Sequence, residues 1–145
     1  MTHCAVLTYH SQNVRGNGTG DNDHVALRED LDRLHAAGLR FTGLKELVDW
    51  LESSGGGEPP GDVCLSFDDG CDFDVRDLEF PGFGAQRSFI GIMQDFLDRH
   101  GADSQPGLHA TSFVIASPEA RRLIDARSLF GRRWMSEDWW CEALE

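Results

Sequence analysis

The sequence predicts an α/β protein in which parallel strands alternate with helices. Three short apolar segments have the length and composition of buried strands: residues 5–9, 63–67 and 110–115. Between them, large apolar residues recur at three- and four-residue spacing, as they do on one face of a helix. Because strands that alternate with helices pair in parallel, we expect either an open doubly wound sheet or part of a (β/α) barrel.

The stretches between the strands carry residues that start helices. Asparagine, aspartate, serine and threonine side chains cap helix N-termini. We expect such caps at one of residues 21–23 and at Thr42, Ser117 and Ser136. The sequence therefore predicts helices that follow each of these caps, the last over residues 137–144, and a further helix over residues 86–100.

Two connections lack these patterns. Residues 53–60 are rich in serine, glycine and proline, so we expect an internal flexible loop and no domain boundary. Residues 71–85 form a long acidic connection after the second strand. They do not match a calcium-binding loop, because Arg76 and Asp77 occupy the places of a ligand and of the invariant glycine. We expect this acidic loop to be solvated.

Size and charge limit the classes of function. The 145 residues, 40% of them hydrophobic, fit a single domain with one core. Acidic residues number 25 against 13 basic ones, and the net charge of −12 disfavours binding to nucleic acid or to an anionic membrane surface. The first residues lack the regions of a signal peptide, and no apolar stretch reaches the length of a membrane span, so we expect a cytoplasmic protein.

The four cysteines favour free thiols. They form no C-x-x-C pair and are too sparse for a small disulfide-stabilised fold. A thiolate zinc site is therefore not expected.

The main candidate site is Asp68-Asp69-Gly70, which follows the second predicted strand. The carboxyl ends of parallel strands are where α/β proteins place their sites. Adjacent side chains point to different sides, so one carboxylate can bind a metal while the other accepts a proton from water. The same tripeptide is also typical of a simple turn, because aspartate and glycine are common turn residues.

Five segments occur in an order that is typical of one enzyme family. The most specific is VCLSFDDG at residues 63–70, in which Ser66 replaces the threonine usual in this motif. The supporting segments are VLTYH at 6–10, LREDLDRLHAAGLRF at 27–41, LKEL at 44–47 and HATSFV at 109–114. Together they resemble the N-terminal half of the polysaccharide deacetylase (NodB-homology) family.

This resemblance implies a deformed (β/α) barrel and a hydrolase that removes N- or O-acetyl groups from a polysaccharide or oligosaccharide. The bond cleaved is a non-peptide carbon–nitrogen bond or an ester. The resemblance makes Asp68 the general base that activates water and Asp69 a ligand of a divalent metal, usually zinc. The implied partner is an acetylated carbohydrate.

The metal ligands of this family also include an H-[ST]-x-x-H motif, and the 145 residues contain no such motif. We therefore expect an incomplete domain, truncated before that motif, with little activity of its own because the ligand set is incomplete. A barrel cut at this point would leave an uncovered sheet edge, through which we expect self-association.

Other polar and aromatic residues are weaker candidates. Tyr9 and His10, at the end of the first strand, are expected to line the substrate cleft, although His10 also fits a solvated loop or a structural role. Three tryptophans could stack on sugar rings, but they fit better on a helix that packs against the core: Trp134, Trp139 and Trp140.

Two other interpretations compete with a deacetylase. The chain could be a non-catalytic domain of the same fold that binds carbohydrate or a protein partner. It could also be an unrelated small α/β protein in which Asp68-Asp69-Gly70 is only a turn. An H-[ST]-x-x-H motif encoded directly after residue 145 would favour the enzyme.

Overall fold

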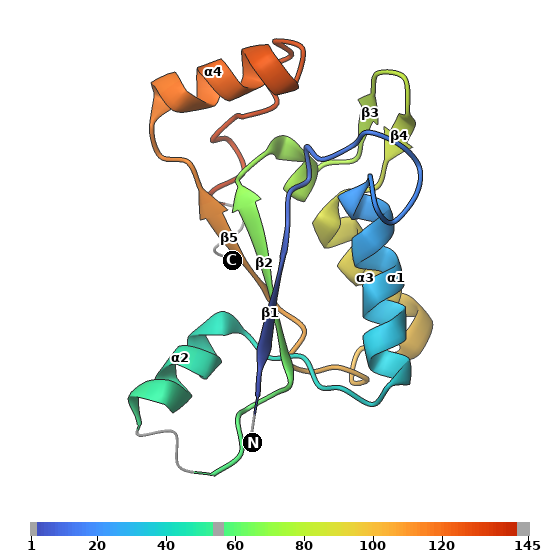
Figure 1. Cartoon of the computed structure of the whole chain (residues 1–145), viewed down its shortest axis with the longest axis vertical. Helices are drawn as coiled ribbons and strands as arrows, with labels where there is room; N and C mark the ends of the chain where they lie inside the picture. Colours follow the sequence, from blue (N-terminus) through green and yellow to red (C-terminus); the bar gives the residue numbers. More distant parts are fainter. Residues whose placement is uncertain (1–2, 54–56, 142–145) are drawn as a thin grey trace.

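A parallel sheet forms the centre of the molecule. The computed structural model of the chain describes residues 3–53 and 57–141. Three strands, β1 (Ala5–Tyr9), β2 (Val63–Asp69) and β5 (Ala110–Val114), form this sheet in the order β1-β2-β5 (Figure 1). The mixed α/β class with parallel strands is therefore confirmed. β2 is the central strand, as its continuous apolar sequence predicts.

The strand register brings the carboxyl ends of β1 and β2 to one edge of the sheet. In this parallel pairing Ala5 lies opposite Val63, and Tyr9 lies opposite Phe67. β2 continues beyond this last pair, and its final residues, Asp68 and Asp69, pair with β5 instead. The two aspartates thus extend past the end of β1 while β5 still supports them.

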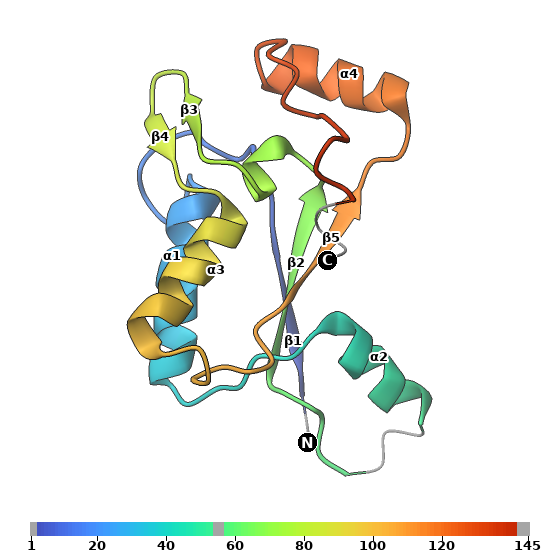
Figure 2. The same ribbon diagram turned by 180° about the vertical axis from the view of Figure 1, so that it is seen from behind.

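Two helices cover one face of the sheet. Helices α1 (Asp23–Ala36) and α3 (Phe89–His100) lie side by side there, as both views show (Figures 1 and 2). Helix α2 (Leu44–Glu52) lies near the amino ends of the strands, and α4 (Pro118–Ser128) lies beyond the carboxyl ends of β2 and β5 (Figure 1). The main core between α1, α3 and the sheet includes Leu27, Leu31, Phe67, Phe89 and Phe96. Full burial of a side chain of this size stabilises the fold by about 1.5–3 kcal/mol.

Of the four predicted helix caps, two are found and two, Thr42 and Ser136, are wrong. Asn22 caps α1, since its side-chain oxygen accepts from the N–H of His24 at 2.9 Å, and Ser117 caps α4. Helix α2 begins at Leu44 after Gly43, not after Thr42. Thr42 is held in an extended segment instead, because its N–H donates to the Val63 carbonyl at 2.9 Å.

Residues 71–85 are folded and do not form an open loop. They contain the 3₁₀ helix η1 (Asp72–Asp74) and most of an antiparallel hairpin made of β3 (Leu78–Phe80) and β4 (Gly84–Gln86). The hairpin also corrects the predicted helix over residues 86–100. Gln86 pairs with Leu78 in the hairpin, so α3 begins only at Phe89, after the capping residue Ser88.

The C-terminal segment packs against η1 and the hairpin as a second cluster. Phe73 and Leu129 are completely buried there, and the Trp134 ring meets Phe73 edge-on with centroids 4.9 Å apart. The helix predicted over residues 137–144 is not found in its described part, because residues 137–141 form turns; residues 142–145 lie outside the described residues. Ser136 does not cap a helix, since its N–H and Oγ both donate to Asp72 Oδ1 at 2.8 Å.

The structure also describes part of the predicted flexible loop at residues 53–60 and all four cysteines. Residue 53 and residues 57–60 have no regular structure, and residues 54–56 lie outside the described residues. No helix in the described part of the chain is long and apolar enough to cross a membrane. The four cysteines are free, as predicted.

Candidate functional site

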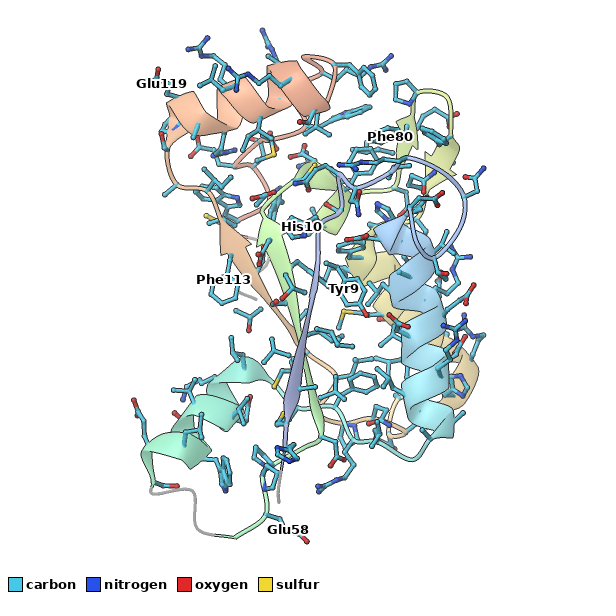
Figure 3. All side chains as sticks on the ribbon, in the orientation of Figure 1. Tyr9, His10, Glu58, Phe80, Phe113 and Glu119 are labelled. Atoms are coloured by element: carbon cyan, nitrogen blue, oxygen red, sulfur yellow. The ribbon has the colours of Figure 1, made fainter. Side chains whose placement is uncertain are left out.

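Carboxylate and imidazole side chains meet at the carboxyl edge of β1 and β2. Asp68 and Asp69 are the last two residues of β2, and His10 directly follows β1. Figure 3 shows His10 at this end of β1. Sites in α/β proteins gather at this edge, because the loops that follow parallel strands converge there.

Asp68 and His10 are close neighbours. His10 Nε2 lies 3.9 Å from Asp68 Oδ2, and the two side chains are 44% and 37% exposed. Water and a dissolved substrate can therefore reach both groups. A carboxylate in this setting can accept a proton from water.

Asp69 has a backbone conformation that is unusual for a residue with a side chain. Its φ is 75°, and Gly70 follows with a φ of 74°. Gln12 Nε2 donates to Asp69 Oδ2 and ties the carboxylate to the loop after β1. The other amide atom, Gln12 Oε1, is buried and has no hydrogen-bond partner within the described residues. Strained backbone of this kind clusters at functional sites, where the surrounding structure maintains it.

Asp74 is a buried carboxylate next to this edge. Only 1% of the residue is exposed, and Ser11 Oγ donates to its Oδ1 at 2.5 Å. Ser112 Oγ of β5 lies 3.5 Å from its Oδ2. Burial raises the pKa of Asp74 to about 7; the two serine hydroxyls oppose this shift, and the nearby charges of Asp69 and Asp72 add to it. A carboxyl group that titrates near neutrality can exchange protons under ordinary conditions.

Three of the four acidic residues in the connection after β2, Asp72, Asp74 and Asp77, are anchored by hydrogen bonds, which corrects the expectation of a solvated loop; the fourth, Glu79, is exposed. Asp72 is 4% exposed and accepts from Ser136 and from Arg76 Nη1, the latter at 2.9 Å. Asp77 accepts from the N–H of Ser88 at 2.8 Å and from Arg87. These hydrogen bonds hold the pKa of Asp77 below its usual range. The acidic side chains thus connect η1 and the hairpin to the rest of the fold.

A cavity of about 800 Å³ opens beside His10. His10 and Gln12, which line it, are the residues that contact Asp68 and Asp69. The rest of its wall combines aromatic and aliphatic side chains with amide, hydroxyl and guanidinium groups: Asn13, Val14, Arg15, Phe80, Phe83, Ser128 and Phe130. Such a mixture of flat apolar surface and a few polar groups is typical of small-molecule sites.

A second cavity, of about 820 Å³, lies along β5. Asp74 and Ser112 supply polar groups, and Trp139 and Trp140 are among its apolar walls. Trp139 is 2% exposed, so it packs in the interior as expected, although from a turn and not from a helix.

Tyr9 lies elsewhere than expected. It is 5% exposed, and its hydroxyl donates to Asp30 Oδ2 of α1 at 2.9 Å. Figure 3 shows its side chain on the α1 side of the sheet, apart from His10. Because side chains alternate along a strand, Tyr9 faces the core while the next residue reaches the rim. Tyr9 is therefore a core residue and does not line either cavity.

The resemblance implies a divalent metal bound by Asp69, so the other side chains that could bind a metal matter here. Within residues 3–53 and 57–141, no three histidine, cysteine, aspartate or glutamate side chains converge as a metal-binding group. A catalytic zinc ion normally has three protein ligands. A catalytic zinc ion at Asp69 would therefore need ligands in addition to the side chains that lie together in the described residues.

Comparisons of the chain with protein-family models, with curated proteins and with solved structures found no match.

Sequence reasoning missed the residues that support the aspartates. The sequence alone shows only that Ser11 and Gln12 follow the first strand and that Asp74 lies in an acidic stretch. The position of Ser11 and Gln12 directly after a strand was the available signal for a role at this edge. No local pattern marked Asp74, because its burial depends on contacts with Ser11 and Ser112, which are distant in sequence.

Proposed function

We propose that this chain acts on acetylated carbohydrate as part of a metal-dependent deacetylase with a partial (β/α) barrel. The observation that carries the proposal is the position of Asp68 and Asp69 at the carboxyl end of β2, where His10 Nε2 lies 3.9 Å from Asp68 Oδ2. The strained backbone of Asp69 supports it, as does the resemblance of the SFDDG segment.

Asp68 is the general base in this proposal. Its partial exposure lets it contact the attacking water, and His10 lies close enough to orient that water. Asp68 takes a proton as the water oxygen attacks the acetyl carbonyl. The bond from the carbonyl carbon to the sugar nitrogen or oxygen then breaks, the departing atom takes up a proton, and acetate leaves a free amine or hydroxyl group on the sugar.

Asp69 is a metal ligand in this proposal. A bound divalent metal, zinc in the first place, would polarise the acetyl carbonyl. Gln12 orients the Asp69 carboxylate through its donated hydrogen bond. The H-[ST]-x-x-H motif that the resemblance assigns to the other ligands is not among the 145 residues.

The cavity beside His10 suits a sugar. Sugar rings have apolar faces that pack on aromatic side chains, and the wall contains Phe80, Phe83 and Phe130. Sugar hydroxyl groups need polar partners, which Arg15 and Gln12 offer.

Binding of a divalent metal at Asp69 tests the deacetylase proposal. We would follow the backbone amide resonances of the chain while Mn²⁺ is added, and then compete with Zn²⁺. Paramagnetic broadening should be strongest around residues 68–70 and His10. Asp69→Asn should abolish it, whereas Asp138→Asn, a change to an exposed carboxylate outside the site, should leave it unchanged. Equal broadening in Asp69→Asn would contradict the proposal.

Release of acetate from acetylated chitooligosaccharide or xylan is the second readout. Because the described residues supply fewer ligands than a catalytic zinc requires, we expect little release by the chain with added Zn²⁺. Any metal-dependent release should disappear in both Asp68→Asn and Asp69→Asn. Release that survives both changes would place the chemistry elsewhere.

Binding without catalysis is the second candidate function, and the aromatic and polar wall of the cavity beside His10 favours it. The chain would then hold a carbohydrate or protein partner in the cavity beside His10. Calorimetric titration with acetylated chitooligosaccharide in the presence of a chelator separates the two functions. Binding that needs no metal, is lost in Phe83→Ala and persists in Asp69→Asn favours the second candidate.

A further inference from the structure

Two cysteine side chains meet at the amino end of the sheet, opposite the candidate site. Cys4 Sγ and Cys64 Sγ are 3.7 Å apart, although the residues are 60 positions apart in the sequence. The parallel register explains this proximity. Val6 pairs with Cys64, and Cys4 lies two positions before Val6, so the two cysteines project from the same face of neighbouring chain segments.

The two thiols differ in environment. Cys64 is completely buried, and this burial, together with its hydrogen bond to Cys4, raises the pKa of its thiol to about 12. Cys4 is partly exposed, and it precedes the first residue of β1, so strand pairing does not hold its backbone. An external reagent therefore reaches Cys4 first.

We infer that Cys4 and Cys64 form a dithiol that a soluble disulfide, such as glutathione disulfide, oxidises to an intramolecular disulfide bond. The sulfur atoms are 3.7 Å apart, and rotation of the Cys4 side chain can bring them towards the bond length of about 2.05 Å. A C-x-x-C motif is not needed, because strand register and not sequence spacing brings the pair together.

The oxidation proceeds in two exchange steps. The Cys4 thiolate attacks one sulfur of glutathione disulfide, forms a mixed disulfide and releases one glutathione. Cys64 then loses its proton, attacks the Cys4 sulfur and releases the second glutathione. The two protein thiols lose two electrons and two protons, and glutathione disulfide gains them. Because Cys64 is protonated at neutral pH, the second step is slow and the mixed disulfide on Cys4 forms first.

The other two cysteines are internal controls. Cys71 is completely buried and donates to the Trp134 carbonyl at 3.2 Å, so it should not react in the folded chain. Cys141 is exposed. It should take up glutathione but form no bond within the chain.

Mass spectrometry of the whole chain tests the inference. The folded protein is incubated with glutathione disulfide, its remaining thiols are blocked with N-ethylmaleimide, and it is cleaved at aspartate. Asp68 and Asp69 lie between Cys64 and Cys71, so this cleavage separates those two cysteines. The expected product is a peptide containing Cys4 linked to a peptide containing Cys64.

Matched variants complete the test. Cys4→Ser, a change at a partly exposed position, should protect Cys64 from oxidation, and Cys141→Ser should leave the Cys4–Cys64 product unchanged. The oxidised chain should also unfold several degrees higher than the reduced chain, because the bond closes a long loop. Two results would overturn the inference: no linked peptide when Cys141 is fully modified, or an equal yield of the link in denaturant.

Discussion

The carboxyl group of Asp74 should make the stability of the protein depend on pH. Its pKa in the folded chain is about 7, above the ordinary value of 3.8, chiefly because the group is buried. Between these values the unfolded chain has lost a proton that the folded chain keeps, so the free energy of unfolding falls as pH rises from about 4 to 7. The total loss is on the order of 4 kcal/mol. Urea unfolding should show this decrease in the free energy of unfolding for the natural chain. In Asp74→Asn most of the decrease should be absent.

Asp77 is the control for this pH measurement, because its pKa is shifted in the opposite direction. Hydrogen bonds from the Ser88 N–H and Arg87 lower it, so their contribution to stability is present above the ordinary pKa and is lost as pH falls. Asp77→Asn should therefore change stability at neutral pH and leave the slope between pH 4 and 7 intact. If the free energy of unfolding of Asp74→Asn fell between pH 4 and 7 as steeply as that of the natural chain, the proposed role of Asp74 would be contradicted.

For single residues, the sequence predicts which side chains lie close together when this follows from the positions of the strand ends. The proximity of His10 and Asp68 follows from two strands that end together, and both ends are readable as apolar runs. The burial of Asp74 is not readable, because it results from hydroxyl groups contributed by the loop after β1 and by β5. An isolated aspartate in an acidic stretch has no local sign of such partners.

Among the secondary-structure elements, the start of α1 depends on one side chain. Asn22 caps the helix and also donates to Gln86 Oε1 of β4 at 2.9 Å, and it is 1% exposed. Asn22→Ala removes the cap and leaves a buried acceptor unpaired, so it should lower the free energy of unfolding by about 2–3 kcal/mol. Chemical denaturation measures this loss.

Ser117 offers a matched comparison, because its hydroxyl caps α4 with a bond of 3.3 Å at an exposed position and has no second partner among the residues that the structure describes. Ser117→Ala should cost about 1 kcal/mol or less. If the two variants lost equal stability, the contact between Asn22 and Gln86 would contribute nothing.

The elements that sequence predicts well are those whose signals are local. The sequence signals for strands β1, β2 and β5 and for the caps Asn22 and Ser117 lie in neighbouring residues. The hairpin β3–β4 and the turns over residues 137–141 depend on tertiary contacts. Asp72 binds the backbone and hydroxyl of Ser136, and this contact directs the chain away from the predicted helix.

For the whole molecule, we expect self-association through the sheet edges. β1 and β5 each pair only with β2 in the part of the chain that the structure describes. Residues 110–116 carry no charge, and Phe113 is 53% exposed on the side of the sheet away from α1 and α3 (Figure 3). Uncharged edge strands readily pair with another copy. Size-exclusion chromatography should show larger species at higher concentration.

Salt and two substitutions test this association. The net charge of −12 opposes contact between copies, so added salt should increase the larger species by screening it. Phe113→Lys should favour the monomer, whereas Leu123→Lys, at a 41% exposed position on α4, should have little effect. A monomer at every concentration and salt level would show that the edges do not pair.

At position 69, the residue that would give the most stable fold differs from the residue that the proposed chemistry needs. The φ of Asp69, 75°, suits glycine, whereas the proposed metal ligand requires a carboxylate. Asp69→Gly should therefore gain up to about 1 kcal/mol of stability, the relief of strain being partly offset by the greater freedom of glycine in the unfolded chain. In a library randomised at residue 69, survival of heating should enrich glycine and asparagine, while a screen for metal capture should retain aspartate. In a related protein that no longer used this edge of the sheet, Asp69 could be replaced without loss of function. The residue at position 69 would then indicate whether the site is still under selection.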